Sequence, residues 1–578
     1  MRVTKDTALL FTVLTAALVL RLLPIASDFP NLSSLDERSY VETALRFGTG
    51  RFALSSFFHG GLYQLILFLE YAAYFVFGRV FGVFGSSADF LLAYIDDPSR
   101  LFLMARLTVV LCGVGVVWLT AAIASRVYQR RVGLMAGVFA AFSLLMFQLS
   151  FLALADVPAV LLLLLAVYFA VLSVEEPAER RFYCAAAVLV GLAAAGKYHT
   201  GFGVVPLAAA ALIKSWGRQD RIGWILHLAL LGFVFVAAGF CLGIPQVVAN
   251  PAGFYDDVFH RLGNQYAGYD PDRTAWRFLF THHLRNGLGI PLEAASLLGF
   301  AFALFRRSKW DLVLLSFPAA FYLLFMNSVG FAYHLLPAIP FLLILAARFL
   351  DAVVETGLRR QSLGVSLLVA LIVVAPSLLD SVKLVRVMRS PSTRTAAKAW
   401  IEAHIPDGST LMAEGYMFTI PVFGPPLVDN RSTLNRDIAF VKDQNGAGRL
   451  PSLRLANFDR LFGTTRAYDI VKLRFLDSAA IAGSRPPFLI MTTEGDRPVG
   501  KELESMFLTR DYFEKRAAVT EDIRRHYAVL ATFAPAGEFT NMFPHLMDED
   551  YRLIREWPLL AGGGSRGPAI TIWERRSP

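Results

Sequence analysis

Cysteine is scarce in this sequence. Its 578 residues include three cysteines, Cys112, Cys184 and Cys241, and each lies within an apolar run. Three isolated thiols cannot form a zinc or redox motif, and the long polar C-terminal region has none, so disulfides do not stabilise that region. The sequence also lacks internal repeats of about 20 to 50 residues, heptad arrays and low-complexity tracts. Repeat proteins and coiled coils are therefore excluded.

Charged residues are also few. They make up 17% of the sequence, whereas 55% is hydrophobic, and the mean hydropathy is +0.51. Many apolar runs are long enough to cross a bilayer, so we predict a polytopic membrane protein. The net charge of +9 does not indicate nucleic acid as a partner, because Lys and Arg stand in short clusters between the apolar runs, as topology signals do.

Eleven apolar runs, separated by tight polar breaks, are predicted to be transmembrane helices. The first is expected to be retained rather than cleaved, since it leads into Arg21 and Pro24 with no small-x-small cleavage site. The eleven runs are Thr7–Ile25, Leu101–Ser125, Val132–Phe151, Val157–Val174, Phe182–Gly196, Gly201–Trp216, Ile222–Gly243, Leu288–Phe305, Leu312–Ser328, Phe331–Leu350 and Gln361–Leu379.

A further run, Gly61–Phe84, contains Glu70 and Arg79 and many aromatic residues. If this run does not cross, the basic clusters all fall on the side of the N-terminus, as the positive-inside rule requires. We therefore predict a long outer loop, residues 28–100, with an aromatic helix at the interface. The clusters are Arg126/Arg130/Arg131, Arg180/Arg181, Lys214/Arg218/Arg221, Arg306/Arg307/Lys309 and Arg359/Arg360, together with Arg2 and Lys5.

The odd number of predicted crossings also orients the remaining polar segments. With eleven crossings and the N-terminus inside, Asp36, Asp156, Lys197 and the whole C-terminal region face outward. Residues 182–213 could form one long helix, but the basic residues at both ends belong inside. Two short spans joined by a turn at Lys197 fit better.

The composition changes at about Ser381. We predict a transmembrane domain over residues 1–380 and an extracytoplasmic domain of soluble α/β type over residues 381–578. The second domain is long enough to bury its own core. Its predicted elements are a helix at Ala396–His404, stopped by Pro406-Asp407-Gly408, and short strand-like runs at Phe488–Met491, Tyr527–Phe533 and Ala569–Trp573.

Two adjacent acids, Asp36 and Glu37, stand in the outer loop. Paired carboxylates at a membrane face favour chemistry on something that the membrane carries, whereas a transporter more often keeps its acids near the midplane. A local explanation also exists. Ser34 and Glu37 form a capping box, so both acids could simply begin a surface helix, Leu35–Phe47, that Gly48 stops.

Several short motifs run in order along the membrane part. Because of these motifs and their order, the chain resembles a GT-C glycosyltransferase that uses polyprenyl-phosphate sugars. This is the group that contains the protein O-mannosyltransferases and the aminoarabinose transferase of lipid A. The segment 397–409 also resembles one that such enzymes carry after their last span. The motifs are Asp36-Glu37-x-x-Tyr40 with Ala44 and Gly48, His59-Gly60-Gly61-Leu62-Tyr63, Ala105-Arg106-Leu107, Asp156-Val157-Pro158, Gly196-Lys197-Tyr198, and His334-Leu335-Leu336-Pro337 with Pro340.

The chain departs from the family pattern at three places. Gly60 and Gly61 replace the two prolines of a His-Pro-Pro segment, and His334 stands where Arg is commoner. No Asp-x-Asp metal motif lies near Asp156, which argues against a metal-dependent variant like the oligosaccharyltransferases. We predict no cofactor, and a divalent cation has no supporting motif. Beyond Ser409 no subfamily is indicated.

The resemblance implies that one sugar moves, with inversion, from a polyprenyl phosphate to a lipid, glycan or protein hydroxyl on the outer side of the bilayer. This chemistry needs a base for the hydroxyl and cations for the leaving phosphate. Asp36 is the candidate base. Glu37 is a cap, an acceptor ligand or an orienter of Asp36. Asp156 is a second acidic contact or the N-cap of a helix that opens with Pro158.

The remaining candidates surround the donor and its phosphate. Lys197 suits the phosphate as a point cation at the outer end of a span, although a lysine there also snorkels to the headgroups. Histidines at such positions are also common as packed interface residues. The other donor-site candidates implied by the resemblance are His59, Arg106, His334, Tyr40, Tyr63 and Tyr198.

Two other classes of function stay open. A transporter or flippase of lipid-linked sugars would bind at the midplane, often between inverted repeats. A receptor-like scaffold would use its outer domain to bind cell-wall polymers. Neither alternative needs Asp36 for sugar transfer, so that residue separates them from an enzyme.

Overall fold

The structure, a computed structural model, divides the chain into two compact units. Unit 1 comprises residues 1–25, 36–76 and 101–385, and unit 2 comprises residues 26–35, 77–100 and 386–578. Unit 2 thus takes in parts of the outer loop as well as the C-terminal region. The described residues are 5–32, 34–50, 52–54, 56–175, 179–261, 277, 279–325, 332–358, 362–417, 419–443, 449–492, 510–535, 554 and 565–576.

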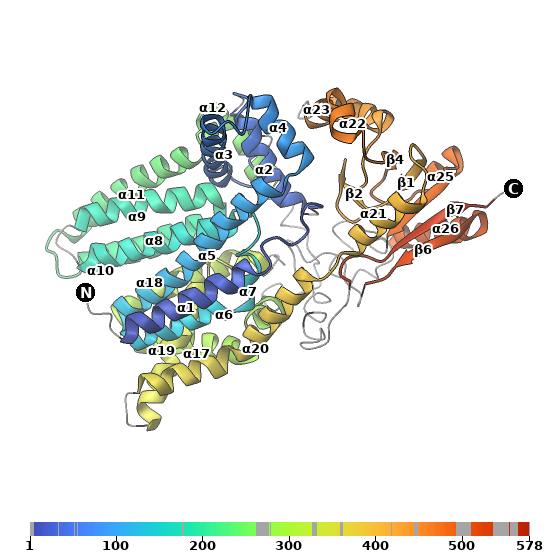
Figure 1. Cartoon of the computed structure of the whole chain (residues 1–578). Coiled ribbons are helices and arrows are strands. Elements are labelled where there is room, and N and C mark those ends of the chain that lie inside the picture. The colour runs from blue at the N-terminus through green and yellow to red at the C-terminus, as the bar shows by residue number, and fades with distance from the viewer. Residues whose placement is uncertain are drawn as a thin grey trace. The chain divides into compact units, whose positions relative to one another are not determined.

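Unit 1 is helical (Figure 1). Each of the eleven predicted runs contains a helix, and the predicted surface helix is present as α2. The elements are α1 (Lys5–Leu22), α2 (Leu35–Phe47), α3 (Leu62–Val80), α5 (Ser99–Val127), α6 (Arg130–Phe142), α7 (Leu144–Gln148), α8 (Asp156–Glu175), α9 (Glu179–Gly196), η1 (Tyr198–Gly203), α10 (Val204–Ser215), α11 (Arg221–Gly243), α12 (Gln246–Ala249), α13 (Pro251–Tyr255), η2 (Asp256–Arg261), η3 (Leu279–Leu284), α16 (Arg285–Leu288), α17 (Ile290–Arg306), α18 (Lys309–Phe325), η4 (Ala332–Leu335), α19 (Ile339–Leu358) and α20 (Leu363–Arg389).

Within the described ranges, four helices are long and apolar enough to cross a membrane: α5, α8, α11 and α20. A fifth span arises if Leu279–Leu288 and α17, which meet at 119°, are counted together. Breaks shorten other predicted runs, as where α6 ends at Phe142 before α7. The count of eleven crossings stays a prediction. Arg2, Arg359 and Arg360, on which the topology prediction partly rests, lie outside the described residues.

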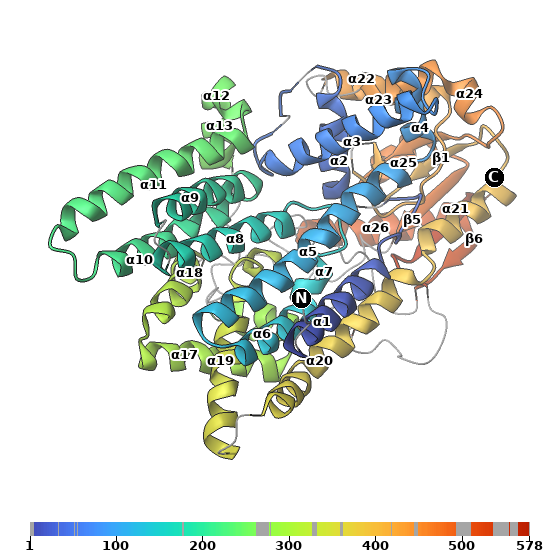
Figure 2. The same cartoon turned by 60° about the vertical axis from the view of Figure 1, so that its left-hand side comes forward.

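The helices α8, α9 and α11 lie side by side (Figures 1 and 2). Glycines bring α9 and α11 into backbone contact: a Cβ at Gly191 would lie 2.1 Å from the Val236 oxygen, and one at Gly239 would lie 2.2 Å from the Val188 oxygen. Small residues at such crossings let membrane helices approach closely. The helix α9 ends at Gly196, so the predicted turn at Lys197 is confirmed.

Unit 2 contains a mixed five-stranded sheet of order β4-β1-β5-β7-β6. Strands β4, β1 and β5 are parallel, with Met412 of β1 paired to Val471 and Leu489, while β7 runs antiparallel to β5 and β6. Its elements are α4 (Ser87–Asp96), α21 (Thr393–His404), β1 (Thr410–Ala413), β2 (Tyr416–Met417), β3 (Ile420–Pro421), α22 (Arg431–Asp443), α23 (Arg449–Ala456), α24 (Phe458–Phe462), β4 (Asp469–Lys472), α25 (Ser478–Ser484), β5 (Phe488–Thr492), α26 (Arg510–His526), β6 (Tyr527–Phe533) and β7 (Ile570–Arg575).

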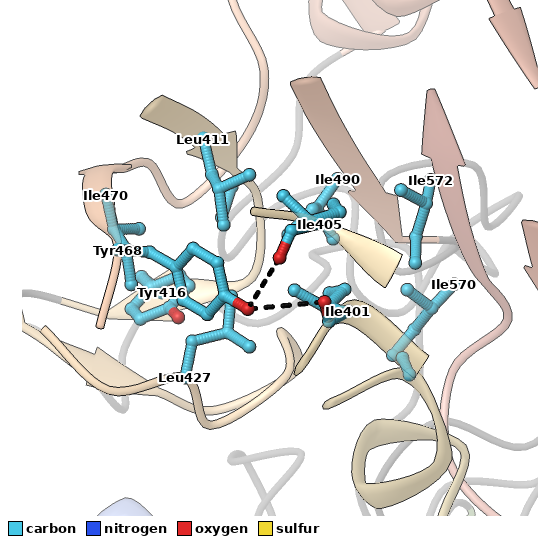
Figure 3. Packing of buried hydrophobic residues seen from close by; sticks show 12 residues of the cluster. Ile401, Ile405, Leu411, Tyr416, Leu427, Tyr468, Ile470, Ile490, Ile570 and Ile572 are labelled. Atoms are coloured by element: carbon cyan, nitrogen blue, oxygen red, sulfur yellow. Dashed lines mark hydrogen bonds between the residues drawn. The ribbon is translucent and has the colours of Figure 1, made fainter. Parts of the chain in front are cut away.

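One hydrophobic cluster of unit 2, where α21 packs against the sheet, contains isoleucines, leucines, alanines and two tyrosines (Figure 3). The buried hydroxyl of Tyr468 donates to the carbonyls of Ile401, at 3.2 Å, and Ile405, at 3.4 Å, on the last turn of α21 and just beyond it. These bonds tie the ring of Tyr468 to the C-terminal end of the helix. The predicted α/β character of this region is confirmed, because its predicted helix and strands fall within or overlap α21, β5, β6 and β7.

Candidate functional site

The first turn of α2 presents Asp36. Its carboxylate is partly exposed and forms no hydrogen bond or ion pair with any residue that the structure describes. One turn further along α2, Tyr40 is buried, with 1% of its surface exposed. Burial first, and then the charges of Asp156 and Asp36, raise the pKa of Tyr40 well above its ordinary value. The charges of Asp36 and Asp156 therefore both help to keep the Tyr40 hydroxyl protonated.

Glu37, next to Asp36, is used differently. Its carboxylate accepts Nε of Arg106 at 2.7 Å and Nη2 at 2.8 Å, and both side chains are almost fully buried. The backbone N–H of Ala153 donates to the same carboxylate at 2.7 Å, and Nη1 of Arg106 donates to the Ile25 carbonyl at 2.8 Å. Bidentate Arg–carboxylate pairs fix geometry as well as adding energy. This pair fastens α2 to α5 and to the segment before α8.

A second ion pair joins the ends of α8 and α9. Lys197 follows the last residue of α9, and its Nζ lies 3.2 Å from Oδ2 of Asp156, the first residue of α8. Lys197 also lies over the ring of Tyr333, 5.2 Å from its centroid. Oδ1 of Asp156 is buried and has no hydrogen-bond partner among the described residues. A buried carboxylate oxygen without a partner is costly, so this atom has capacity for a ligand.

The loop before α3 packs against Lys197. Gly60 has a φ of +72°, and a Cβ there would lie 2.6 Å from the Ala195 oxygen. The N–H of Gly61 donates to that same oxygen at 3.0 Å. Proline, with its fixed negative φ, cannot occupy position 60 in this conformation. The Gly-Gly departure from the family pattern thus follows from how closely the loop approaches the end of α9.

Two further contacts hold this loop. The hydroxyl of Tyr198 donates to the Phe57 carbonyl, and the Phe57 N–H donates to Oδ2 of Asp257 at 2.9 Å. The loop presents His59 to the site, where burial first and then the charge of Lys197 lower its pKa to about 4. The imidazole is therefore neutral at pH 7 and can donate or accept a hydrogen bond.

Two more histidines meet near Lys197. The rings of His199 and His334 lie 5.8 Å apart, and Tyr333 contacts His334 with ring centroids 4.3 Å apart. Burial first and then Lys197 lower the pKa of His199 to about 3, so it is also neutral. Lys197 thus stands among aromatic and neutral imidazole rings.

The structure brings most of the predicted residues together. Lys197, Asp156, His59 and Tyr40 are linked by contacts or mutual electrostatic effects, and Tyr198 fixes the loop beside them. Tyr63 lies behind Tyr40, with ring centroids 5.4 Å apart, and its hydroxyl donates to the Ala105 carbonyl at 2.9 Å. Arg106 serves Glu37, and its predicted role at the phosphate stays a prediction, as do the roles of the other site residues.

Sequence reasoning did not find Tyr333 or Asp257. Tyr333 directly precedes the His334 motif, so its position was a usable signal. Asp257 stands 200 residues from the backbone group that it binds, in a segment without a motif. Among the described residues no cluster of three His, Cys, Asp or Glu side chains could hold a metal ion.

The helical unit contains apolar helices that are long enough to cross a membrane. Residues 99–240 match the family described as dolichyl-phosphate-mannose-protein mannosyltransferase. The resemblance predicted from the motifs is thereby confirmed. No curated protein matches the chain by sequence.

The chain is also similar to solved structures. The archaeal oligosaccharyltransferase AglB from Archaeoglobus fulgidus, in complex with an inhibitory peptide and a dolichol-phosphate, superposes with a TM-score of 0.50 at 11% identity, covering 99% of this chain and 88% of that one. ArnT from Cupriavidus metallidurans, bound to undecaprenyl phosphate, superposes with a TM-score of 0.49 at 16% identity, covering 84% and 94%. At such identity the likeness to AglB establishes the fold alone.

Proposed function

We propose that this protein is an integral-membrane glycosyltransferase that moves a sugar, with inversion, from a polyprenyl-phosphate donor to an acceptor hydroxyl on the extracytoplasmic side. The observation that carries the proposal is the carboxylate of Asp36, which pairs with no residue that the structure describes and, like Asp156 of the Asp156–Lys197 pair, raises the pKa of the buried Tyr40. A proton acceptor and a cation then flank one site. The matched family and the lipid phosphate bound to AglB support a lipid-linked donor.

Asp36 acts as the general base. An ionised carboxylate that is engaged by no described neighbour is able to accept the proton of the acceptor hydroxyl as the sugar–oxygen bond forms. General-base help of this kind contributes about a hundredfold to ten-thousandfold. Tyr40, kept protonated by its surroundings, can donate a hydrogen bond toward the same region.

Lys197 meets the phosphate of the donor. Negative charge grows on this phosphate as its bond to the sugar breaks, and a preplaced ammonium stabilises the growing charge. The neutral ring of His59 adds hydrogen-bonding capacity without competing for the anion. Oδ1 of Asp156, which has no hydrogen-bond partner among the described residues, is suited to accept a hydrogen bond from a sugar hydroxyl.

The test is sugar transfer by Asp36→Asn in reconstituted membranes supplied with a polyprenyl-phosphate sugar. Asn keeps the shape of Asp and remains a good helix cap, but it cannot accept the proton. We expect transfer to fall at least about a hundredfold while donor binding stays. Glu42→Gln, on the same helix, is the matched control and should retain transfer. Full activity of Asp36→Asn would disprove the mechanism and would favour a flippase or transporter.

The proposal also requires an outer location for the site and for the C-terminal region. The one-sided basic clusters and the odd number of predicted spans support it. A reporter that is active only in the cytoplasm, fused after Pro578, should be silent, and a periplasmic-type reporter should be active. The reverse result would overturn the topology and the outward placement of Asp36.

A further inference from the structure

Two arginines lie over the ring of Trp224, near the start of α11. The guanidinium carbon of Arg218 is 3.9 Å from the ring centroid, and that of Arg180, at the start of α9, is 5.3 Å from it. Both arginines are exposed, and neither forms an ion pair with a residue that the structure describes. Trp224 is 8% exposed, and its buried Nε1 has no hydrogen-bond partner among the described residues. Two cations and a buried donor thus meet at one place, an arrangement that suits an anionic ligand.

The surroundings of Trp224 are basic. Three further cations, Arg181, Lys214 and Arg221, stand beside this place in the sequence. The one acid in the connection between α10 and α11 is Asp220, which caps α11 by accepting a backbone N–H at 3.2 Å. The positive-inside rule accounts for such charge at an inner membrane surface. It does not require that two guanidinium groups be held on a buried indole, so the stacking needs a further explanation.

An apolar groove of about 440 Å³ lies beside this place, between the neighbouring helices α10 and α11 (Figure 2). Tyr183 of α9, Leu207 and Ala229 are among the residues that line it. The hydroxyl of Tyr183 donates to the Leu228 carbonyl at 3.0 Å, so this polar atom is already satisfied. Tyr183, Leu207 and Trp224 pack in one hydrophobic cluster. The wall of the groove therefore adjoins the tryptophan on which the two arginines lie.

The groove has the length of one membrane leaflet. Along α11 it extends from Ala229 to Phe240, a rise of about 17 Å. Half of the hydrocarbon core of a bilayer is about 15 Å thick. Trp224 precedes Ala229 by a rise of about 8 Å, which separates the arginines from the apolar part. A headgroup at one end and an acyl chain along the rest fit these two distances.

The opposite end of the groove is aromatic. Phe240 packs against Tyr198 and Phe254, with ring centroids 6.4 and 5.8 Å apart. A chain lying in the groove therefore meets charge at the Trp224 end and aromatic rings at the Phe240 end. This polarity is that of a lipid whose headgroup lies on the side that the predicted topology makes the inner one. The phosphate of the proposed donor, by contrast, would lie at Lys197 on the outer side.

We propose that this groove binds an anionic phospholipid, with the headgroup phosphate at Arg180 and Arg218 and an acyl chain between α10 and α11. The fork of donors on an arginine suits a phosphate, and stacking on an aromatic ring keeps that fork in place. Basic pockets between membrane helices on the cytoplasmic side bind anionic headgroups in this way. The bound lipid joins the starts of α9 and α11 to α10 and therefore stabilises the protein. The inference goes beyond the proposed sugar transfer and does not depend on it.

The experiment measures lipid binding to the full-length protein in detergent micelles by native mass spectrometry. The probes are phosphatidylglycerol, which is anionic, and phosphatidylcholine with the same acyl chains, which is zwitterionic. We expect the wild type to retain phosphatidylglycerol in preference, and its Tm to rise with the concentration of that lipid. In Arg180→Gln/Arg218→Gln the affinity for phosphatidylglycerol should fall about twenty-five-fold, since each basic residue near an anionic headgroup contributes about fivefold. The affinity of this variant for phosphatidylcholine should stay within about twofold of the wild type, because that lipid carries no net charge.

Ala208→Phe tests the groove itself. Ala208 lies on its wall and is exposed, so the larger side chain occupies the groove without entering the protein core. The affinity for both lipids should then fall. The matched control for charge is Arg306→Gln/Lys309→Gln, which removes two exposed cations from the adjoining ends of α17 and α18. This control should bind phosphatidylglycerol as the wild type does.

Equal affinity of the wild type for the two lipids, or an equal loss of phosphatidylglycerol in the control, would overturn the inference. Displacement of the lipid by soluble glycerol phosphate would also overturn it, because the site would then be a phosphate contact without a groove. Preferential binding of a polyprenyl phosphate that persists in Arg180→Gln/Arg218→Gln would assign the groove to the donor instead.

Discussion

Two buried ion pairs in unit 1 differ in how fully they are satisfied. Glu37 and Arg106 meet through two bonds of 2.7 and 2.8 Å, and a backbone N–H and a carbonyl complete them. Asp156 and Lys197 meet through one contact of 3.2 Å, Lys197 stays 15% exposed, and one oxygen of Asp156 has no partner in the described part of the chain. The first pair holds the fold, and the second has room for a ligand.

The largest expected effect comes from breaking the satisfied pair. Arg106→Ala leaves the Glu37 carboxylate buried without its cation, which should destabilise the protein by about 3 to 5 kcal/mol. The measurement is the thermal unfolding of the purified protein in detergent. The double variant Glu37→Gln/Arg106→Met should recover part of the loss. Wild-type stability with lost donor binding would instead assign Arg106 to the phosphate, as the family resemblance implied.

The unsatisfied pair should respond in activity rather than in folding. We expect Lys197→Ala to lower sugar transfer by about a hundredfold to a thousandfold, since the growing phosphate charge loses its cation. The Tm should change much less than in Arg106→Ala, because Lys197 is 15% exposed and meets Asp156 through one contact of 3.2 Å, whereas Arg106 is buried and makes two bonds to Glu37. Lys214→Ala, at the far end of α10, is the control and should transfer normally. Near wild-type turnover by Lys197→Ala would remove this lysine from the site.

A substitution at Gly60 tests whether the loop before α3 must approach the end of α9, beside the Asp156–Lys197 pair, as closely as it does. In Gly60→Ala the new methyl group meets a backbone oxygen at 2.6 Å, so the loop must shift, at a cost of about 1 to 3 kcal/mol. We expect the donor KM to rise, because His59 moves with the loop. Gly50→Ala is matched: Gly50 has a φ of +79° but open space around it, so only the backbone penalty remains. An equal donor KM in Gly60→Ala and Gly50→Ala would show that donor binding does not depend on how closely the loop approaches the end of α9.

The smallest effect concerns pH. The folded pKa of His59, about 4, lies below its ordinary value of 6.5, so the unfolded chain binds this proton more readily. The contribution of His59 to stability is therefore complete above pH 6.5 and is lost as the pH falls toward 4. His59→Gln should show a smaller drop in Tm between pH 7 and pH 5 than the wild type. An unchanged drop would mean that His59 is not buried beside the cation.

Local sequence signals predicted much of this fold. The helix Leu35–Phe47, the break at Lys197 and the α/β character of the C-terminal region follow from caps, charge placement and short alternating runs, all of which are read over a few residues. Glu37 shows the limit. Its neighbours in sequence supported a capping box, but the contacts that the structure describes for it reach Arg106 and Ala153, 69 and 116 residues away.

Other features required the folded chain for the same reason. The need for glycine at position 60 arises from the end of α9, and Asp28 is bound by Arg566, 538 residues away. Neither contact joins residues that are near in sequence, and no sequence periodicity marks them. Motifs thus identified the candidate residues. Tertiary contacts are needed to separate those that stabilise the fold from those proposed to take part in the reaction.

The glycine contact between α9 and α11 fixes the register of Lys197 along α11. Because backbone meets backbone at Gly191 and Gly239, the two helices cannot slide past each other by one residue without driving a side chain into a slot with no space for it. The lysine after α9 is therefore held at one position along the long apolar helix α11. A lipid-linked phosphate lies at a depth set by its own headgroup region, so under the proposed function this fixed register would present the ammonium to the phosphate at one level.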